Sequence, residues 1–230
     1  MKLKAILLAG VVCLAGAVTS SAQTVFSANT VGFVNKNIPT GFSMIANPVS
    51  AADNSLDALF ADVPVGTQLF LFDPVAGTYQ IFEFSNPLFG GGDPAWSPNG
   101  AATLMPGQGA FISNSSGDAF TVTFAGEVQQ GDASNLAIGA GFSIVSSVVA
   151  QGGAVATDLG FPSEVGDQIF QFDNGSGAYN IFEFSNPLFG GGDPAWSPSE
   201  PSVEVAESFF VNKVGATSWT RNFDPNSSNS

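Results

Sequence analysis

Two copies of one 18-residue block carry most of the side chains in this chain that could do chemistry. Residues 81–98 and 181–198 are identical, IFEFSNPLFGGGDPAWSP, and lie 100 residues apart. Each block holds a glutamate, an aspartate and a tryptophan, and a tyrosine lies two positions before it. Aromatic rings beside carboxylates suit sugars, because a ring covers the apolar sugar face and carboxylates accept hydrogen bonds from hydroxyls. The candidate ligand-binding residues are Tyr79, Glu83, Asp93, Trp96, Tyr179, Glu183, Asp193 and Trp196.

A second interpretation of the block needs no ligand. Three consecutive glycines allow tight curvature and the prolines fix φ around them. The segment after Phe84 then reads as a long connection folded back on a sheet, with Trp96 as a buried plug and Phe89 beside it. Recombination between two copies in one gene would also keep the blocks identical. Both interpretations stay open.

The composition excludes several classes of active site. The chain has no histidine, which removes histidine-based triads, histidine-ligated metals and histidine general bases. Its one cysteine, Cys13, lies in an N-terminal apolar run. A Ser–Lys dyad would have to use Lys36 or Lys213, and neither lies in a recognisable motif.

The acidic residues form no catalytic motif either. Asp73 and Asp173 lack the Asp-Thr/Ser-Gly turn of an aspartic dyad. The paired glutamates or aspartates of the two blocks would make a glycosidase site only if the blocks faced each other closely. We therefore predict no enzyme and no catalytic residues.

Metal motifs are weak. Gly90-Gly-Gly-Asp93 lacks the nine-residue period of glycine-rich calcium repeats, and Asp173-Asn-Gly-Ser-Gly177 lacks the glutamate and helices of an EF-hand. Hairpin turns account better for the Asp–Gly segments at 73–77 and 173–177. We predict no cofactor and no metal ligands, and keep calcium-stabilised modules as a third interpretation.

The N-terminus has the pattern of a cleaved signal peptide over residues 1–22. Lys2 and Lys4 precede the apolar run Ala5–Val18, and small residues end at Ala22. That run is shorter than the ~20 residues that span a bilayer. We predict a secreted or cell-surface protein, with the periplasm as the alternative, and a polar tail at 224–230.

After cleavage the chain keeps 19 acidic residues against Lys36, Lys213 and Arg221, a formal charge of −16. Such a surface repels phosphate backbones and anionic lipid, so we expect no nucleic-acid partner and no membrane insertion of the mature chain. Surface glycans or other extracellular proteins remain as partners. The mature chain has no cysteine, so it folds without disulfides.

Repetition extends beyond the identical blocks. GFSMIANPVS from Gly41 aligns with GFSIVSSVVA from Gly141, and GTQLFLFD from Gly66 aligns with GDQIFQFD from Gly166. We predict two homologous modules, residues 24–124 and 125–223. In both modules, short segments alternate apolar and polar residues with a period of two, and each segment ends at Gly, Pro, Asn or Asp. The expected fold is all-β, two tandem β-sandwich or barrel-like modules, with one short helix at 54–61 capped by Asp53 or Asn54.

The module openings and closings resemble tandem all-β modules of exported bacterial and archaeal surface proteins. The pattern is carried by Gly41–Pro48, by the hairpin Phe70–Tyr79 and by the closing Leu104–Ile112. The second half keeps the opening and the hairpin but closes with Val205-Ala-Glu-Ser208. The resemblance implies a surface or matrix component with no catalytic residues.

Taken together, these patterns predict an exported, non-catalytic structural or adhesive β-module protein of the cell surface or extracellular matrix. The alternative is a carbohydrate-binding protein that uses the duplicated aromatic and acidic loops.

Overall fold

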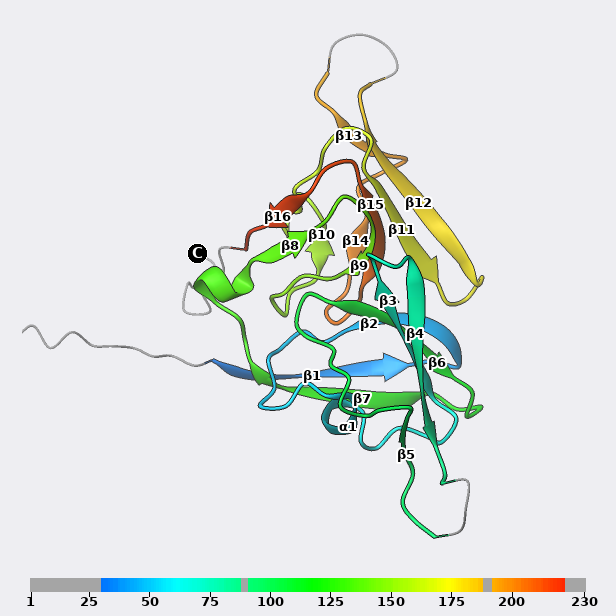
Figure 1. The fold of residues 1–230 in the computed structure, drawn as a ribbon. Coiled ribbons are helices and arrows are strands. Elements are labelled where there is room, and N and C mark those ends of the chain that lie inside the picture. Colours follow the sequence, from blue (N-terminus) through cyan, green and yellow to red (C-terminus); the bar gives the residue numbers. More distant parts are fainter. Residues whose placement is uncertain (1–29, 88–90, 188–191, 222–230) are drawn as a thin grey trace, which may run out of the picture.

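The computed structural model describes residues 30–87, 91–187 and 192–221. The predicted signal peptide, the polar tail and Phe89 lie outside these residues. The described chain is predominantly β and forms five antiparallel sheets (Figure 1), which confirms the predicted fold class at that level. The barrel-like form is wrong for the described strands, because their sheets stay open and keep edge strands.

The first half of the described chain contains one five-stranded sheet and one two-stranded ribbon. The sheet has the strand order β2-β6-β3-β4-β5, and β1 pairs with β7 along its whole length. The elements are β1 Val31–Ile38, β2 Gly41–Ala46, α1 Leu56–Leu59, β3 Gln68–Asp73, β4 Thr78–Ser85, β5 Ala95–Ser97, β6 Gly109–Asn114 and β7 Phe120–Glu127. The expected module boundary between 124 and 125 therefore falls inside β7.

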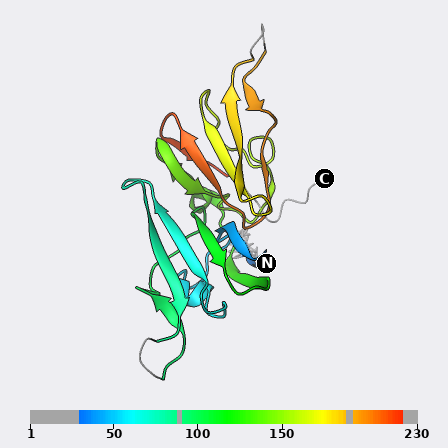
Figure 2. The same ribbon diagram turned by 90° about the vertical axis from the view of Figure 1, so that its right-hand side faces the viewer.

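The second half has the same strand order. Its five-stranded sheet runs β9-β15-β11-β12-β13, and β8 pairs with β16 as β1 does with β7. The two five-stranded sheets occupy opposite halves of the molecule (Figure 2). The elements are the 3₁₀ helix η1 Gly131–Ser134, β8 Leu136–Ile138, β9 Gly141–Val145, β10 Gly153–Ala154, β11 Gln168–Asp173, β12 Ala178–Ser185, β13 Ala195–Ser197, β14 Ser202–Val203, β15 Phe209–Lys213 and β16 Thr217–Trp219.

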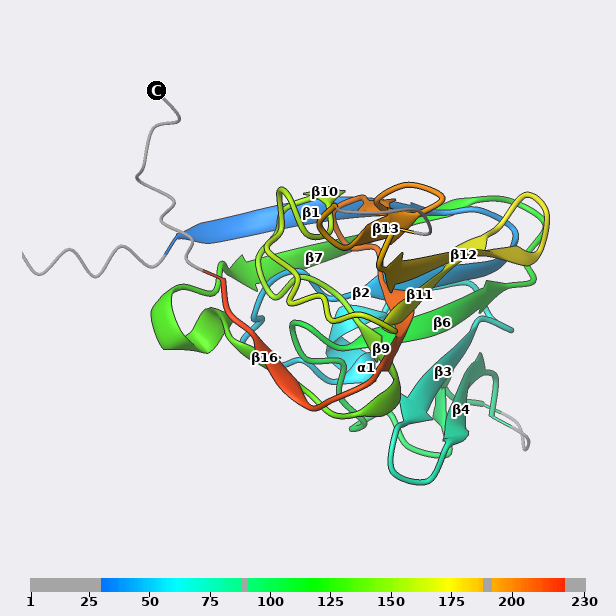
Figure 3. The same ribbon diagram turned by 90° about the horizontal axis from the view of Figure 1, so that it is seen from above.

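Each half has its own core between the five-stranded sheet and the neighbouring ribbon. In the first half Leu69, Phe82 and Phe84 point inward because alternate residues of a strand face opposite sides. They meet Val122 and Phe124 of β7, which lies beside β1 (Figure 3). The second half packs Ile169, Val211 and Trp219 in the same manner. One face of each five-stranded sheet is therefore committed to its own core.

The single α-helix among the described residues is shorter than the predicted helix and begins at a later residue. It spans Leu56–Leu59, and Ser55 caps it by accepting a hydrogen bond from the Ala58 N–H at 3.3 Å. Asp53 does not cap the helix, because its carboxylate accepts from the Ser55 N–H instead. No helix in the described part of the chain is long and apolar enough to cross a membrane.

The two predicted hairpin turns are confirmed. Asp73 Oδ1 accepts from the N–H groups of Val75 and Ala76, and the turn ends at Gly77 with φ of 66°. Asp173 accepts from Gly175 and Ser176 in the same way, which lowers the pKa of its carboxyl. These aspartates organise the turns of the β3–β4 and β11–β12 hairpins.

The closing turns of the two halves share one conformation although their sequences differ. The Gln108 N–H donates to Met105 O at 3.0 Å, and the Glu207 N–H donates to Glu204 O at 3.2 Å. In each four-residue turn, 105–108 and 204–207, the side chain of the fourth residue accepts a hydrogen bond from the backbone N–H of the first residue. The third residue has positive φ, 87° at Gly107 and 61° at Ala206. Ala206 is the one non-glycine residue with positive φ among the described positions.

Exchange of alanine and glycine should therefore have opposite effects at these two turns. We expect Ala206→Gly to raise the free energy of unfolding by about 0.5–1 kcal/mol, because strain at positive φ is relieved and outweighs the added freedom of the unfolded chain. Gly107→Ala should lower it by more than 1 kcal/mol, since a Cβ there would lie 2.8 Å from Val148 Cγ2. Urea unfolding measures both, and equal signs would contradict a shared turn.

Candidate functional site

The two five-stranded sheets meet along an aromatic seam. We define the seam as Met44, Phe72, Phe111, Ile144, Phe172 and Phe210, from the sheet faces turned away from the two cores. Phe72 lies 5.2 Å from Phe210 between ring centroids, and Phe172 lies 5.4 Å from Phe111. Because Phe172 corresponds to Phe72 and Phe210 to Phe111, the seam has approximate two-fold symmetry.

Backbone contacts across the seam follow the same symmetry. The Ala46 N–H donates to Ala206 O at 3.1 Å, and the Ser146 N–H donates to Gly107 O at 3.0 Å. Both acceptors belong to the closing turns. Near the symmetry axis the chains come so close that a Cβ on Gly109 would lie 2.4 Å from Ser208 Cβ. Positions 109 and 208 are equivalent in the two halves, and the space between them therefore holds a side chain at only one of the two.

The seam continues into an exposed aromatic groove. We define this groove as the hollow lined by Phe42, Phe70, Tyr79, Ile81, Phe111, Phe172, Gly177 and Tyr179, with a volume of about 490 Å³. Half of the Ile81 surface and 45% of the Phe42 surface face solvent. Large contiguous patches of exposed apolar surface on folded proteins mark sites of contact with a partner or ligand.

The groove brings together the only two tyrosines of the chain. Each tyrosine ring contacts a phenylalanine of the opposite half. The ring centroids of Tyr79 and Phe210 are 6.4 Å apart, and those of Tyr179 and Phe111 are 6.5 Å apart. Partial burial, and secondarily the nearby Tyr179, raise the pKa of Tyr79 to about 12. Burial also raises the pKa of Tyr179. Both phenols are therefore neutral hydrogen-bonding groups at neutral pH.

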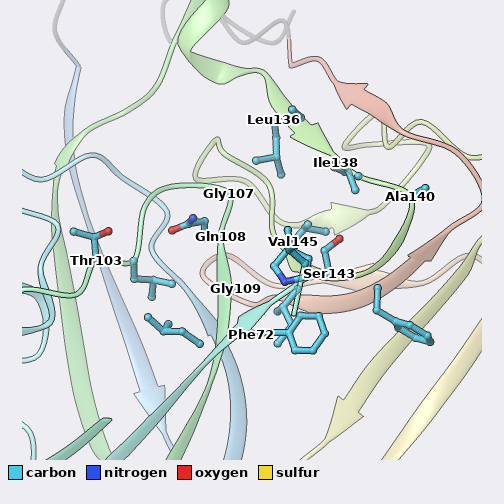
Figure 4. A pocket seen from close by; sticks show the side chains of 18 residues that line it. Phe72, Thr103, Gly107, Gln108, Gly109, Leu136, Ile138, Ala140, Ser143 and Val145 are labelled. Carbon is cyan, nitrogen blue, oxygen red and sulfur yellow. The ribbon is translucent and has the colours of Figure 1, made fainter. Parts of the chain in front are cut away.

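Two further clefts flank the seam at symmetry-related places. The polar cleft is lined by Lys36, Ser43, Gln171, Asn174, Ser202, Glu204 and Glu207 with their neighbours. Lys36 pairs with Glu204 across it at 3.1 Å. The apolar cleft is lined by Leu71, Phe72, Thr103, Gln108, Leu136, Ile138, Phe142, Ser143 and Val145 with their neighbours (Figure 4).

The predicted tryptophans do not present a stacking face to solvent. Trp96 is 4% exposed and Trp196 is 7% exposed. Each is opposite a core phenylalanine in register, Phe84 or Phe184, so it points toward the core. Trp96 Nε1 donates to Phe60 O at 3.3 Å. This burial matches the plug interpretation of the repeated block and is a correction to the use of either ring as a sugar platform.

The predicted carboxylates are exposed and do not converge. Glu83 accepts a hydrogen bond from Gln68 at 3.0 Å, and Glu183 and Trp196 both line a surface pocket. Asp93 and Asp193 are exposed beside β5 and β13, which lie at opposite ends of the molecule (Figure 1). The paired carboxylates therefore form no shared glycosidase cleft. The described residues also contain no group of three or more His, Cys, Asp or Glu side chains placed to hold a metal ion.

Lys213 is committed to a buried ion pair with Asp167. Both side chains are fully buried. The ammonium also donates to Pro162 O at 2.6 Å, and the Asp167 carboxylate accepts from the Val214 N–H at 3.0 Å. In the first half the equivalent positions hold Asn114 and Thr67. Asn114 donates there to three backbone oxygens without any charge.

No family model, no curated protein and no solved structure matches this chain. The resemblance to tandem modules of exported surface proteins therefore stays a prediction.

Sequence reasoning found Tyr79 and Tyr179 but missed the phenylalanines around them. Phe42, Phe70 and Phe111 belong to strands whose alternation puts large apolar residues on both faces. Apolar residues on both faces could have indicated that the second face also makes contacts, since a sheet with one solvated face would alternate apolar and polar residues.

Breaking the buried ion pair from one side should be costly. We expect Lys213→Met to lower the free energy of unfolding by about 3–5 kcal/mol, because Asp167 would keep an uncompensated buried charge. The double variant Asp167→Thr with Lys213→Asn copies the uncharged pair of the first half. It should lose much less in urea unfolding, and a loss equal to that of Lys213→Met would contradict the equivalence of the two positions.

The phenols should titrate late in the folded protein. We expect the near-ultraviolet absorbance of tyrosinate to rise with a component near pH 12 from Tyr79, and near the ordinary pKa of about 10 after unfolding. The free energy of unfolding should fall from about pH 10 to pH 12, because the unfolded chain loses these protons first. Tyr79→Phe should remove the late component, and a native titration centred on pH 10 would contradict phenol burial in the groove.

Proposed function

We propose that this protein is an exported, non-catalytic adhesive or structural component of the cell surface or extracellular matrix. The observation that carries the proposal is the aromatic groove, an exposed apolar surface between the two five-stranded sheets whose lining residues belong to neither core. Residues 1–22 would be removed during export, and the mature chain would begin at Gln23.

The architecture proposed for this role is a duplicated β module. Support comes from the matching strand order of the two halves, from their matching closing turns and from the paired contacts of the seam. The pairing of β7 with β1 favours a boundary after Glu127 over the boundary at 124 expected from the sequence. Two copies held at one seam form a single rigid platform for the groove.

An uncharged or basic extracellular polypeptide with apolar side chains is the partner that fits the groove best. The lining is phenylalanine, isoleucine and tyrosine, which bind by burial of apolar area. Without residues 1–22 the chain has 19 acidic residues against three basic ones, so it would repel acidic partners. The two neutral phenols add hydrogen bonds at the rim.

Carbohydrate binding is the second candidate, and the placement of the tyrosines favours it. Tyr79 and Tyr179 are 39% and 42% exposed in one groove, so their rings can stack on a sugar and their hydroxyls can bind it. The buried tryptophans no longer contribute to this candidate. It now depends on the two tyrosines, with Glu83 farther along the same face of β4.

An array of short peptides and an array of glycans, probed with the mature protein, separate the two candidates. We expect binding to peptides rich in aromatic and aliphatic residues. It should fall at least tenfold in the double variant Phe42→Ser with Ile81→Ser, because the groove loses its two most exposed apolar side chains.

The matched control is Val31→Ser with Phe33→Ser, which removes apolar residues that are 72% and 74% exposed on β1, outside the groove. This control should bind as the parent does. Binding to glycans that disappears in Tyr79→Ala with Tyr179→Ala would establish the second candidate instead. Two blank arrays, or equal loss in the control, would overturn the adhesive role of the groove.

A further inference from the structure

We infer that the outer edge of β1 is a dimerisation surface, which pairs antiparallel with β1 of a second copy of this chain. β1 is eight residues long and pairs with β7 on one side. No other described strand pairs with it, and Figure 3 shows β1 at the margin of the molecule. β1 lines no part of the aromatic groove, so the inference does not rest on the proposed adhesive function.

The register of the ribbon shows which backbone groups of β1 face outward. The Val128 N–H donates to Thr30 O, and Glu127 exchanges two backbone hydrogen bonds with Ser50 on the far side of β7. Residues of an antiparallel strand alternate between bonding to the partner strand and facing away from it. Even-numbered residues of β1 therefore bond to β7, and the N–H and C=O groups of the odd-numbered residues point outward. The outward residues are Val31, Phe33, Asn35 and Asn37.

β2, the edge strand that follows β1 in the chain, has a covered edge. The Asn174 side chain donates to Phe42 O, and Ser208 Oγ donates to Ile45 O at 2.9 Å. Among the described residues, no such bond reaches the outward backbone groups of β1. The outward residues of β1 also include no proline and no charged side chain. An uncovered edge of this kind accepts another extended strand.

The first half also has a longer ribbon than the second. The β8–β16 ribbon contains three residue pairs, against eight for β1–β7. Its first strand begins at Leu136, which corresponds to Lys36, so residues 31–35 of β1 have no paired counterpart in the second half. This extension carries Val31 and Phe33, which are 72% and 74% exposed. The extra length therefore adds an exposed apolar edge that the equivalent ribbon does not have.

The charge distribution favours a second copy as the occupant of this edge. All 19 acidic residues lie at position 53 or later, so β1 and the segments around it contain none. Two copies of an acidic chain repel each other least where neither carries carboxylates. The one charged residue of β1, Lys36, already pairs with Glu204 at 3.1 Å. β1 is thus itself an uncharged extended strand of the kind that its own edge accepts.

A two-fold axis at Val34 would pair the outward residues completely. Val31 would then lie opposite Asn37 of the second copy, and Phe33 opposite Asn35. Each of these pairs exchanges two backbone hydrogen bonds, so the outward N–H and C=O groups of both copies are satisfied. The two Phe33 rings would be diagonal neighbours across the axis, where aromatic side chains reach each other.

Sedimentation equilibrium of the mature protein, over roughly 10 µM to 1 mM, tests this inference. We expect a reversible dimer. Asn35→Pro should raise its dissociation constant at least tenfold, because proline lacks the outward N–H while the β1–β7 ladder keeps its bonds. Asn35→Ala is the matched control, since it removes the same side chain and keeps the N–H, and it should dimerise as the parent does.

A second pair of variants leaves the backbone unchanged. Phe33→Glu should also raise the dissociation constant at least tenfold, because it sets two carboxylates against each other across the axis. Thr121→Glu adds the same charge at an exposed position of β7, one strand away from the free edge, and should have little effect. This pair decides the matter if Asn35→Pro does not fold.

Three results would refute the inference. The first is a monomer throughout the concentration range, which would leave the edge to a different chain. The second is an unchanged dissociation constant in Asn35→Pro when that variant melts at the temperature of the parent. The third is equal weakening by Phe33→Glu and Thr121→Glu, which would assign the dimer contact to another surface.

Discussion

Each five-stranded sheet of this protein has two apolar faces, and exposure of either face to water would cost free energy. One face packs against its own ribbon and the other meets its counterpart across the seam. Full burial of a phenylalanine is worth about 1.5–3 kcal/mol, and partly buried rings such as Phe72, Phe172 and Phe210 contribute less each, while a backbone hydrogen bond is worth roughly 0.5–1.5 kcal/mol. The ring contacts of Phe72, Phe111, Phe172 and Phe210 therefore hold the halves together, and the two backbone bonds mainly fix their register.

The seam also decides where binding surfaces can form. Apolar residues that lie beyond its reach, such as Phe42 and Ile81, remain exposed and make the aromatic groove. At its flanks, equivalent strands place different side chains, so one cleft is crossed by the Lys36–Glu204 pair while the other keeps apolar walls. An approximately symmetric framework thus carries two clefts of different character.

Local patterns in the sequence predicted local structure well. Alternation over Gln68–Asp73 predicted a strand, and the Asp–Gly spacing at 73–77 predicted its turn, because both depend on neighbouring residues only. The role of Trp96 stayed open, since it depends on the register that sets Trp96 opposite Phe84 across β4 and β5. The seam was not predicted either. A strand with two apolar faces indicates that each face packs against another surface or remains exposed as a contact site. The pattern does not indicate which surface packs against it.

The same limit applies to the closing turns and the helix cap. Pro106-Gly107 is a recognisable turn pair, whereas Val205-Ala206 is not. Val205-Ala206 nevertheless adopts the same turn, and the Ala206 carbonyl there accepts a hydrogen bond from the Ala46 N–H across the seam. Tertiary contacts there overrule local preference. At the helix, the sequence favoured Asp53 or Asn54 as the cap, whereas the hydrogen bond from the Ala58 N–H identifies Ser55.

The contact between Gly109 and Ser208 has an evolutionary consequence. On the proposed duplication, a lone ancestral half would present a self-complementary patch and could associate as a symmetric homodimer. In that dimer both axial positions would carry the same residue, and there is no space for two side chains there. On this proposed history the axial residue would have been glycine while the partners were separate molecules. Gene fusion would have removed that requirement, so that one copy acquired serine, whose hydroxyl donates to Ile45 O at 2.9 Å.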